Sequence, residues 1–414
     1  MFCRMELECA VQKYAWGVKG SKSSVAQLAK AVQPDLEVPD DEPFAELWMG
    51  THSSGPSVIK ATGETLGSYI SKQPEVLGGP VIDKFGEQLP FLFKVLSVNQ
   101  ALSIQAHPNK NHAEQLHRER PDVYKDPNHK PEMAIALTPF QALCGFRTAQ
   151  QIIKHFKELP ELRKVVGEEA AEKFIEDHSE ENLKTCFSAM MNSPKDIIAS
   201  ALSDQLQRFS EMDASKGGEL LHDLFLTLHE KYPGDVGCFS IYLLNYLTLQ
   251  PGEAMFLGPN VIHAYLLGDC IECMACSDNV VRAGLTPKYQ DVETLVNMLE
   301  YGMVSAESRN FEGFKMDGYT TMYNPPVPDF AVDKIEVPAG VEQYTLRPME
   351  SASIVLVVEG SAGDVEVNPA SLGEVPHATS LERGSVVFLA AGQSLALKPR
   401  PGSRLLAFRA LCIL

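Results

Sequence analysis

Short apolar runs separated by glycine, proline and polar turn residues fill the first third of the chain. The runs "LPFLFKVLSV" (89–98), "LSIQAH" (102–107) and "PEMAIALTPFQALCGF" (131–146) alternate with turn residues, a pattern typical of β-strands. We therefore predict a mainly β region from Leu7 to about Phe146.

The spacing of apolar residues changes between about Arg147 and Tyr232. They now recur three and four positions apart, first at Ile152, Ile153, Phe156 and Leu159 and later at Leu220, Leu221, Leu224 and Leu228. This spacing indicates amphipathic helices. The polar stretches "NSPKD" (192–196) and "DASKGGE" (213–219) are expected loops. The pattern thus predicts a small helical domain inserted between two halves of a β domain.

Strand and turn patterns return after the helical region, and part of the sequence is repeated. Aligning "LQPGEAMFLGPNVIHA" (249–264) with "LERGSVVFLAAGQSLA" (381–396) pairs Leu249 with Leu381, Gly252 with Gly384, Phe256 with Phe388 and Leu257 with Leu389. Each copy reads as turn, strand, turn, strand, the layout of a jelly roll. His263 falls opposite Leu395, so a metal site is expected only in the first copy.

The predicted fold is mainly β, with two jelly-roll domains and an inserted α-helical domain. The first jelly roll would comprise residues 1–146 and 235–322, interrupted by the helical domain at 147–234. The second jelly roll would occupy 323–414, a range that begins with the proline-rich connector "YNPPVPDF" (323–330).

Composition narrows the possible partners and compartment. A chain of 414 residues is long enough for two or three domains, and a net charge of −18 disfavours nucleic acid or an anionic membrane as partner. The N-terminus lacks a signal-peptide pattern and no apolar run is long enough to span a membrane. Nine scattered cysteines indicate reduced thiols, and a cytoplasmic protein is expected.

Three of these cysteines, Cys270, Cys273 and Cys276, are evenly spaced in "GDCIECMACSDN". Iron–sulfur or zinc ligation is one interpretation, but no fourth ligand follows at a known spacing. Buried structural thiols are the preferred interpretation.

Three polar clusters, "SIQAH" (103–107), "YKDPNHKPE" (124–132) and "VIHAY" (261–265), interrupt the first β domain. Alternation along a strand would place Gln105 and His107 on one face. With Glu132 and His263 they would supply nitrogen and oxygen ligands for a divalent ion and leave room for water or substrate. Alternatively, the histidines are hydrogen-bonded strand residues and Glu132 is a solvated charge; the clusters alone do not decide between these.

"YKDPNHKPE" and "HAYLLGDCIECMACSDNVVRAGLTPK" (263–288) resemble two signature stretches of the type I mannose-6-phosphate isomerases, which are zinc enzymes of the cupin superfamily. The resemblance extends to "YAWG" (14–17), "AELWMGTH" (45–52), "PFLFKVLS" (90–97), "SIQAHPNK" (103–110), "GFR" (145–147) and the terminal "FRA" (408–410), and is weakest in the helical insert. It implies two cupin domains, a helical insertion, and interconversion of mannose 6-phosphate and fructose 6-phosphate through an enediol, a step that feeds mannose into GDP-mannose synthesis and glycosylation.

The resemblance also implies roles for individual residues. Gln105, His107, Glu132 and His263 fall on the family's ligands for one zinc ion per chain, and Arg282 falls on its active-site arginine. Glu272 and Asp278 are both candidates for moving the proton, and either could instead orient a ligand or bind a sugar hydroxyl. The expected substrate-binding residues are Ser103, Lys94, Lys130, Lys288 and Tyr265, although each lysine taken singly could be a solvated surface charge.

Three further expectations complete the prediction. Trp16 and Trp48 are expected in the core rather than stacked on sugar. The partner is a small sugar phosphate, without nucleic acid or membrane, and the chain is expected to be a monomer.

The competing hypotheses are a double-cupin binding protein without activity, and a related cupin enzyme with another phosphosugar or an iron site.

Overall fold

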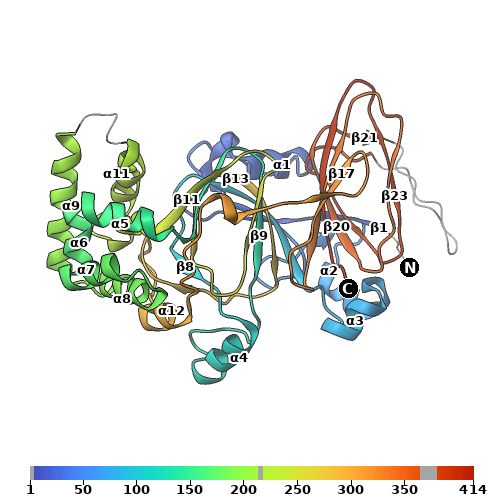
Figure 1. Cartoon of the computed structure of the whole chain (residues 1–414). Helices are drawn as coiled ribbons and strands as arrows, with labels where there is room; N and C mark the ends of the chain where they lie inside the picture. The colour runs from blue at the N-terminus through green and yellow to red at the C-terminus, as the bar shows by residue number, and fades with distance from the viewer. Residues whose placement is uncertain (1–3, 213–217, 364–379) are drawn as a thin grey trace.

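The computed structural model describes residues 4–212, 218–363 and 380–414. Figure 1 shows three parts in a row: helices at one end, a β barrel in the middle and a β sandwich at the other end. The predicted fold class, mainly β with a helical insertion, is confirmed. In the described part of the chain, no helix has the length and apolar character needed to cross a membrane.

The central barrel is built on a sheet of seven strands in the order β15-β12-β9-β13-β7-β5-β2, with β10, β11, β8 and β14 attached through β13 and its neighbours. Their bounds are β15 (Asn310–Phe311), β12 (Ala254–Leu257), β9 (Glu132–Ala136), β13 (His263–Ala275), β7 (Phe91–Val98), β5 (Glu46–Met49), β2 (Ala10–Gln12), β10 (Phe140–Phe146), β11 (Leu244–Leu249), β8 (Gln105–Ala106) and β14 (Val281–Arg282).

Strand β13 connects the two sides of this barrel. Its first residues pair with β8 and β10, and from Gly268 onward it pairs with β7 and β9. Gly268 has φ +111°, and a Cβ atom there would lie 2.4 Å from the carbonyl oxygen of Pro139. Glycine therefore permits both the conformation and the close approach at this corner.

Both faces of the central sheet are buried. Along β7, Phe93 and Val95 contribute to the core shared with the C-terminal domain. Leu96 and Val98 belong instead to the core inside the barrel. Because side chains alternate along a strand, Lys94 points into the barrel with Leu96. The polar site therefore lies in the barrel interior, among apolar side chains.

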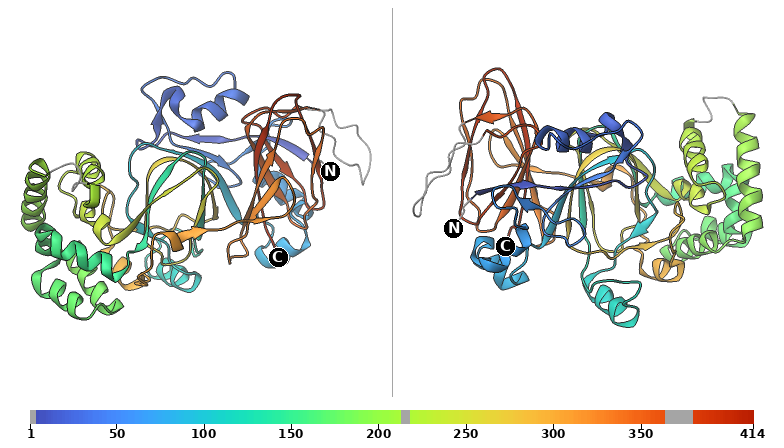
Figure 2. Two further views of the ribbon diagram at one scale, coloured as in Figure 1. Left: turned by 45° about the horizontal axis from the view of Figure 1, so that its top comes forward. Right: turned by 180° about the vertical axis from the view of Figure 1, so that it is seen from behind.

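The C-terminal sandwich includes the start of the chain. Its eight-stranded sheet has the order β16-β17-β18-β24-β20-β22-β1-β6, and β1 pairs antiparallel with β22. Both views in Figure 2 show the N-terminal strand running into this sandwich. This sheet therefore joins strands from the first predicted domain segment to strands of the last one. The domain boundaries themselves remain a prediction. The bounds are β16 (Phe314–Lys315), β17 (Thr320–Tyr323), β18 (Ala331–Val337), β24 (Leu405–Leu411), β20 (Ser353–Glu359), β22 (Val386–Leu389), β1 (Arg4–Glu8) and β6 (Val58–Ile59), with β19 (Tyr344–Leu346), β23 (Leu395–Pro399) and β21 (Ala362–Gly363) in a three-stranded sheet, and β3 (Val18–Lys19) pairing with β4 (Pro43–Phe44).

The repeat seen in the sequence corresponds to equivalent strands. β12 and β22 occupy the same aligned positions, and β13 and β23 begin at the aligned residues His263 and Leu395. The preceding glycines, Gly252 and Gly384, have φ +90° and +88°. The two domains therefore use the same turn to enter equivalent strands.

The inserted domain is helical as predicted, with Ile152, Phe156 and Leu228 buried in its core. The loop "NSPKD" includes the turn between α8 and α9, whereas residues 213–217 of "DASKGGE" lie outside the described residues. The helices are α5 (Ala149–Glu158), α6 (Pro160–Val166), α7 (Glu168–Glu176), α8 (Glu180–Met191), α9 (Lys195–Ser210) and α11 (His222–Lys231), and α12 (Val292–Met298) contacts α8.

The first 146 residues contain helices that the strand-like pattern did not predict. Side chains of Ser23, Thr65 and Asn109 cap three of them by accepting a backbone N–H in the first turn. The helices of this region are α1 (Ser24–Val32), α2 (Leu66–Lys72), α3 (Gly79–Phe85) and α4 (Lys110–Glu119). The chain also contains the short 3-10 helices η1 (Gly20–Lys22), η2 (Pro74–Leu77), η3 (Val236–Tyr242) and η4 (Glu307–Arg309).

Candidate metal centre and active site

Three polar residues form a row across neighbouring strands at one end of the barrel. Gln105 in β8 lies opposite His263 in β13 on one side and opposite Arg282 in β14 on the other. Residues directly opposite in antiparallel strands project on the same face. The three side chains therefore share one surface, although they are far apart in sequence.

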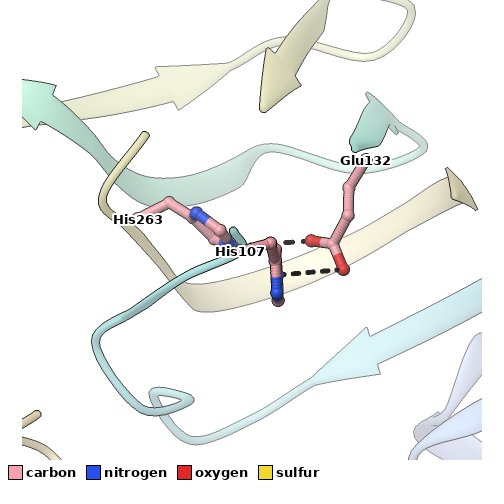
Figure 3. Close-up of side chains that lie close together, drawn as sticks. All are labelled: His107, Glu132 and His263. Atoms are coloured by element: carbon pink, nitrogen blue, oxygen red, sulfur yellow. Dashed lines mark ion pairs between the residues drawn. The ribbon is translucent and has the colours of Figure 1, made fainter. Parts of the chain in front are cut away.

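His107, Glu132 and His263 converge beside this row (Figure 3). The His107 Nε2 atom lies 3.3 Å from Glu132 Oε1, and the His263 Nε2 atom lies 3.5 Å from Glu132 Oε2. One ligand atom from each of these three buried residues lies within 4.8 Å of the others. Two imidazoles and a carboxylate at this spacing can bind one divalent ion.

The Nδ1 atoms of His107 and His263, which point away from Glu132, define which tautomer each histidine adopts. The Nδ1 atom of His107 lies 2.7 Å from the carbonyl oxygen of Asn279, and that of His263 lies 2.8 Å from the carbonyl oxygen of Val261. Because a carbonyl only accepts, each Nδ1 must carry the proton and donate. Both Nε2 atoms then carry a lone pair directed at the centre, as metal ligation requires.

Two buried atoms at the centre have no hydrogen-bond partner among the described residues, His107 Nε2 and Glu132 Oε2. Burial lowers the pKa of His107 to about 4, so its imidazole is neutral. Burial opposes ionisation of Glu132, but the neighbouring Lys130 ammonium holds its pKa well below the usual range. A neutral imidazole nitrogen with a free lone pair beside an ionised carboxylate is the arrangement that a bound cation requires.

Gln105 reaches the same centre through its amide. Its Oε1 atom accepts a hydrogen bond from Ser103 Oγ at 3.2 Å, while its Nε2 atom lies 3.4 Å from His263 Nε2. A half-turn of the amide would exchange the two atoms and direct the oxygen toward the histidines. Gln105 is therefore positioned to add an oxygen ligand.

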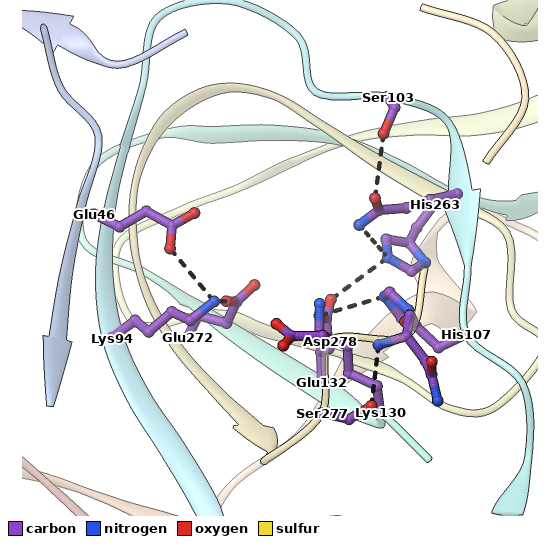
Figure 4. Close-up of polar contacts among 12 residues, drawn as sticks. Glu46, Lys94, Ser103, His107, Lys130, Glu132, His263, Glu272, Ser277 and Asp278 are labelled. Carbon is purple, nitrogen blue, oxygen red and sulfur yellow. Dashed lines mark hydrogen bonds and ion pairs between the residues drawn. The ribbon is translucent and has the colours of Figure 1, made fainter. Parts of the chain in front are cut away.

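A second buried cluster lies on the same inner face of the barrel (Figure 4). The Lys94 ammonium is 3.0 Å from Glu272 and 3.4 Å from Glu46, and it lies 5.1 Å from the centre of the Trp48 ring. Lys94 on β7 stands directly opposite Trp48 on β5 and, on its other side, directly opposite Glu272 on β13. The cluster thus follows from strand register.

This cluster perturbs the ionisation of its members. Burial would lower the pKa of Lys94, but Glu272 and Glu46 raise it, so the ammonium stays charged. Burial and the nearby Glu132 and Glu46 carboxylates raise the pKa of Glu272, against the attraction of Lys94. A carboxyl group with a raised pKa is suited to proton transfer near neutral pH.

Two other candidates lie against the metal centre. The Lys130 ammonium is 3.1 Å from Glu132 Oε1. The Tyr265 hydroxyl is buried, and burial together with the Glu272 and Glu132 charges raises its pKa well above the ordinary value. Tyr265 is therefore a neutral donor facing the carboxylates.

Arg282 is a half-buried cation without an acidic partner. Its Nε atom is buried with no hydrogen-bond partner, and its guanidinium forms no ion pair within residues 4–212, 218–363 and 380–414. Burial lowers its pKa. An uncompensated guanidinium beside a metal-binding cluster is suited to bind an anion.

Asp278 and Lys288 lie at the surface. The Asp278 side chain is 53% exposed and lies 3.2 Å from His52 Nε2, and that hydrogen bond lowers its pKa. Lys288 is exposed, and its ammonium has no polar contact among the described residues. Both differ from Glu272, which is buried.

Sequence reasoning missed several residues that shape the site. Glu46 pairs with Lys94 and accepts a hydrogen bond from the Trp48 indole, and Asn279 orients His107. Glu46 lies in "AELWMGTH", where the only signal in the sequence is the resemblance to the family. Trp48 is buried as predicted. Trp16 is partly buried against the barrel core.

The preferred interpretation of the cysteines holds for two of the three. Cys270 faces the barrel interior, Cys273 faces the core shared with the C-terminal domain, and both are buried. Because they lie on opposite faces of β13, they cannot bind one ion together.

Comparisons with known proteins agree with this geometry. Three type I phosphomannose isomerase family models match the chain: the catalytic domain (residues 4–149), the helical insertion domain (160–244) and the C-terminal domain (321–363). Mannose-6-phosphate isomerase of Homo sapiens is 48% identical over 99% of this chain and 98% of its own, and that of Schizosaccharomyces pombe is 42% identical over 94% and 95%.

Solved structures of the family have the same fold. The apo form of mannose 6-phosphate isomerase from Salmonella typhimurium aligns over the whole of both chains with a TM-score of 0.83 and 33% identity. A zinc-bound mannose 6-phosphate isomerase structure aligns over the same extent with a TM-score of 0.82 and 33% identity. This chain therefore belongs to the type I phosphomannose isomerases.

Proposed function

We propose that this protein is a zinc-dependent isomerase that interconverts mannose 6-phosphate and fructose 6-phosphate through an enediol. The observation that carries the proposal is the convergence of His107, Glu132 and His263, with both imidazoles holding Nε2 toward the carboxylate. Gln105 would complete the ligand set for one zinc per chain. The relatives' names supply mannose 6-phosphate as one of the two sugars and isomerisation as the reaction.

The isomerisation removes a proton next to a carbonyl and returns it to the neighbouring carbon. Zinc, when bound, would supply electrophilic assistance at a sugar oxygen. Arg282 supports the reaction from the adjoining strand, because an unpaired guanidinium can stabilise the negative charge of an enediolate or clamp the substrate.

Glu272 is the proposed proton carrier in preference to Asp278. Glu272 is buried on the inner face of the barrel with a raised pKa, whereas Asp278 is exposed and bonded to His52. Burial makes a carboxylate more basic, and solvent contact does not. Lys94 would keep Glu272 in place through their ion pair.

The substrate's polar groups need donors from several elements. Ser103, Lys130 and Tyr265 lie around Gln105, Glu132 and Glu272, which supports contacts to the sugar hydroxyls. Lys94 is already neutralised by two carboxylates, which favours a positioning role. Lys288 is a cation with no acidic partner among the described residues, which supports a role in attracting the phosphate.

The proposed enzyme works as a monomer in the cytoplasm. A monomer is proposed because the candidate ligands and Arg282 come together within a single chain, so that the site needs no residue from a second copy. The described cysteines are all free thiols, which supports a reducing compartment.

A coupled assay for fructose 6-phosphate tests the proposal. The zinc-loaded protein should convert mannose 6-phosphate, lose activity with a chelator, and regain it with zinc. Glu132→Gln should be inactive, whereas the control Glu87→Gln, at an exposed position, should match the unaltered protein. Absence of conversion by zinc-loaded protein would refute the proposal.

A further inference from the structure

The loop that follows β13 is held by a residue outside the ligand set. The Asp126 carboxylate accepts hydrogen bonds from Ser277 Oγ at 2.9 Å and from the backbone N–H of Asp278 at 2.7 Å. Its backbone carbonyl accepts from Asn279 Nδ2 at 2.6 Å. Residues 277–279 are therefore bonded in succession to one residue, and we call them the Asp126-bound loop.

This loop holds the carbonyl that orients a proposed ligand. Asn279 is 1% exposed, and its carbonyl oxygen lies 2.7 Å from His107 Nδ1. Its backbone N–H donates to Ser277 Oγ at 3.1 Å, and its amide donates to the carbonyl of Asn128 at 2.9 Å. The carbonyl can therefore move little unless several hydrogen bonds break.

We propose that Asp126 is a positioning residue for the metal centre. Its carboxylate fixes the Asp126-bound loop, so that Asn279 holds His107 with the proton on Nδ1 and the lone pair of Nε2 toward Glu132. The inference rests on the proposed function, in which these residues bind zinc. Partners of metal-ligating histidines are known to influence metal affinity through this orientation.

The role requires a carboxylate rather than any polar side chain. Asp126 Oδ1 also accepts from the backbone N–H of Asn128 at 2.9 Å, so each carboxylate oxygen faces one backbone N–H. An asparagine amide would place its NH₂ group against one of these donors. Asp126→Asn should therefore disturb the loop while nearly preserving side-chain volume.

Competition with a chromophoric chelator measures the effect as a zinc dissociation constant. Asp126→Asn and Asp126→Ala should bind zinc about tenfold or more weakly than the unaltered protein. Asp122→Asn, at an exposed aspartate nearby without polar side-chain contacts among the described residues, should bind zinc normally. Ser277→Ala removes the hydroxyl between Asp126 and Asn279 and should weaken zinc binding in the same direction.

Two further measurements separate positioning from general stability. The visible spectrum of the cobalt-substituted protein should change in Asp126→Asn, because it reports the ligand geometry. The melting temperature of the zinc-free protein reports the structural contribution alone. Zinc affinity and a cobalt spectrum equal to those of the unaltered protein, even with a lower melting temperature, would overturn the inference. Failure of the unaltered protein to bind zinc would instead overturn the proposed function, and this inference with it.

Discussion

Replacing Arg282 by methionine should separate activity from stability. Arg282 stands opposite Gln105, its guanidinium has no acidic partner in the described ranges, and burial lowers its pKa. The unliganded protein therefore gains little from this cation. At about 4 Å and an effective dielectric constant of about 20, one cation stabilises one anionic charge by about 4 kcal/mol. Loss of that stabilisation corresponds to about a thousandfold decrease in turnover.

The test is a pair of measurements on each variant. Steady-state kinetics with mannose 6-phosphate should show the loss in kcat for Arg282→Met and a smaller loss for Arg282→Lys, which keeps the charge but not the planar fork. The melting temperature without substrate should equal or exceed that of the unaltered protein. Arg118→Met, at an exposed position on α4 without a polar side-chain contact among the described residues, is the matched control.

Two outcomes would refute this reasoning. Turnover close to that of the unaltered protein would show that Arg282 does not stabilise charge during the reaction. A melting temperature several degrees lower, at unchanged zinc content, would show that Arg282 mainly holds the structure together.

Two further predictions concern buried charges. Lys94→Met leaves Glu272 and Glu46 without their cation and should lower the melting temperature by about 3–6 °C; Lys94→Met combined with Glu272→Gln should recover part of this loss, and an additive loss would contradict the assigned ion pair. In the C-terminal domain, burial raises the pKa of Asp333 to about 6, opposed by the attraction of Arg409. The folded pKa of Asp333 lies above the unfolded value of about 3.9, so between these two pH values the folded protein binds a proton that the unfolded chain has released. Proton binding stabilises the folded protein, and this stabilisation is lost as the pH rises from about 4 through 6. Asp333→Asn, which mimics the protonated form, should therefore raise the melting temperature by about 2–3 °C at pH 7.5 and change it little at pH 4.5; thermal scans at both pH values check this, and an equal effect at both would contradict it.

The elements that the sequence predicted well are those with local signals. Apolar spacing located the helical insertion, and the aligned glycines at 252 and 384 located equivalent strands in the two domains. Short capped helices such as α1 and α4 were missed because they lie among strand-like runs. The pairing of β1 with β22 was missed because no local pattern reports contacts between opposite ends of a chain.

The residues of the candidate site also fall into those that sequence motifs predicted and those that they did not. The proposed ligands came from family motifs, and the structure brings His107, Glu132 and His263 together with Gln105 beside them. Charge partnerships were not predictable, because they depend on strand register and loop conformation. The Lys94 pairing with Glu46 requires β5 beside β7, and the bonding of Asp126 to residues 277–279 requires two loops to meet.

Metal analysis of purified protein tests the central claim most directly. The account predicts about one zinc ion per chain in the unaltered protein and loss of that zinc in Glu132→Gln, with Glu87→Gln unchanged. A zinc content that stays the same when Glu132 is replaced would contradict the proposal that these convergent side chains hold the ion.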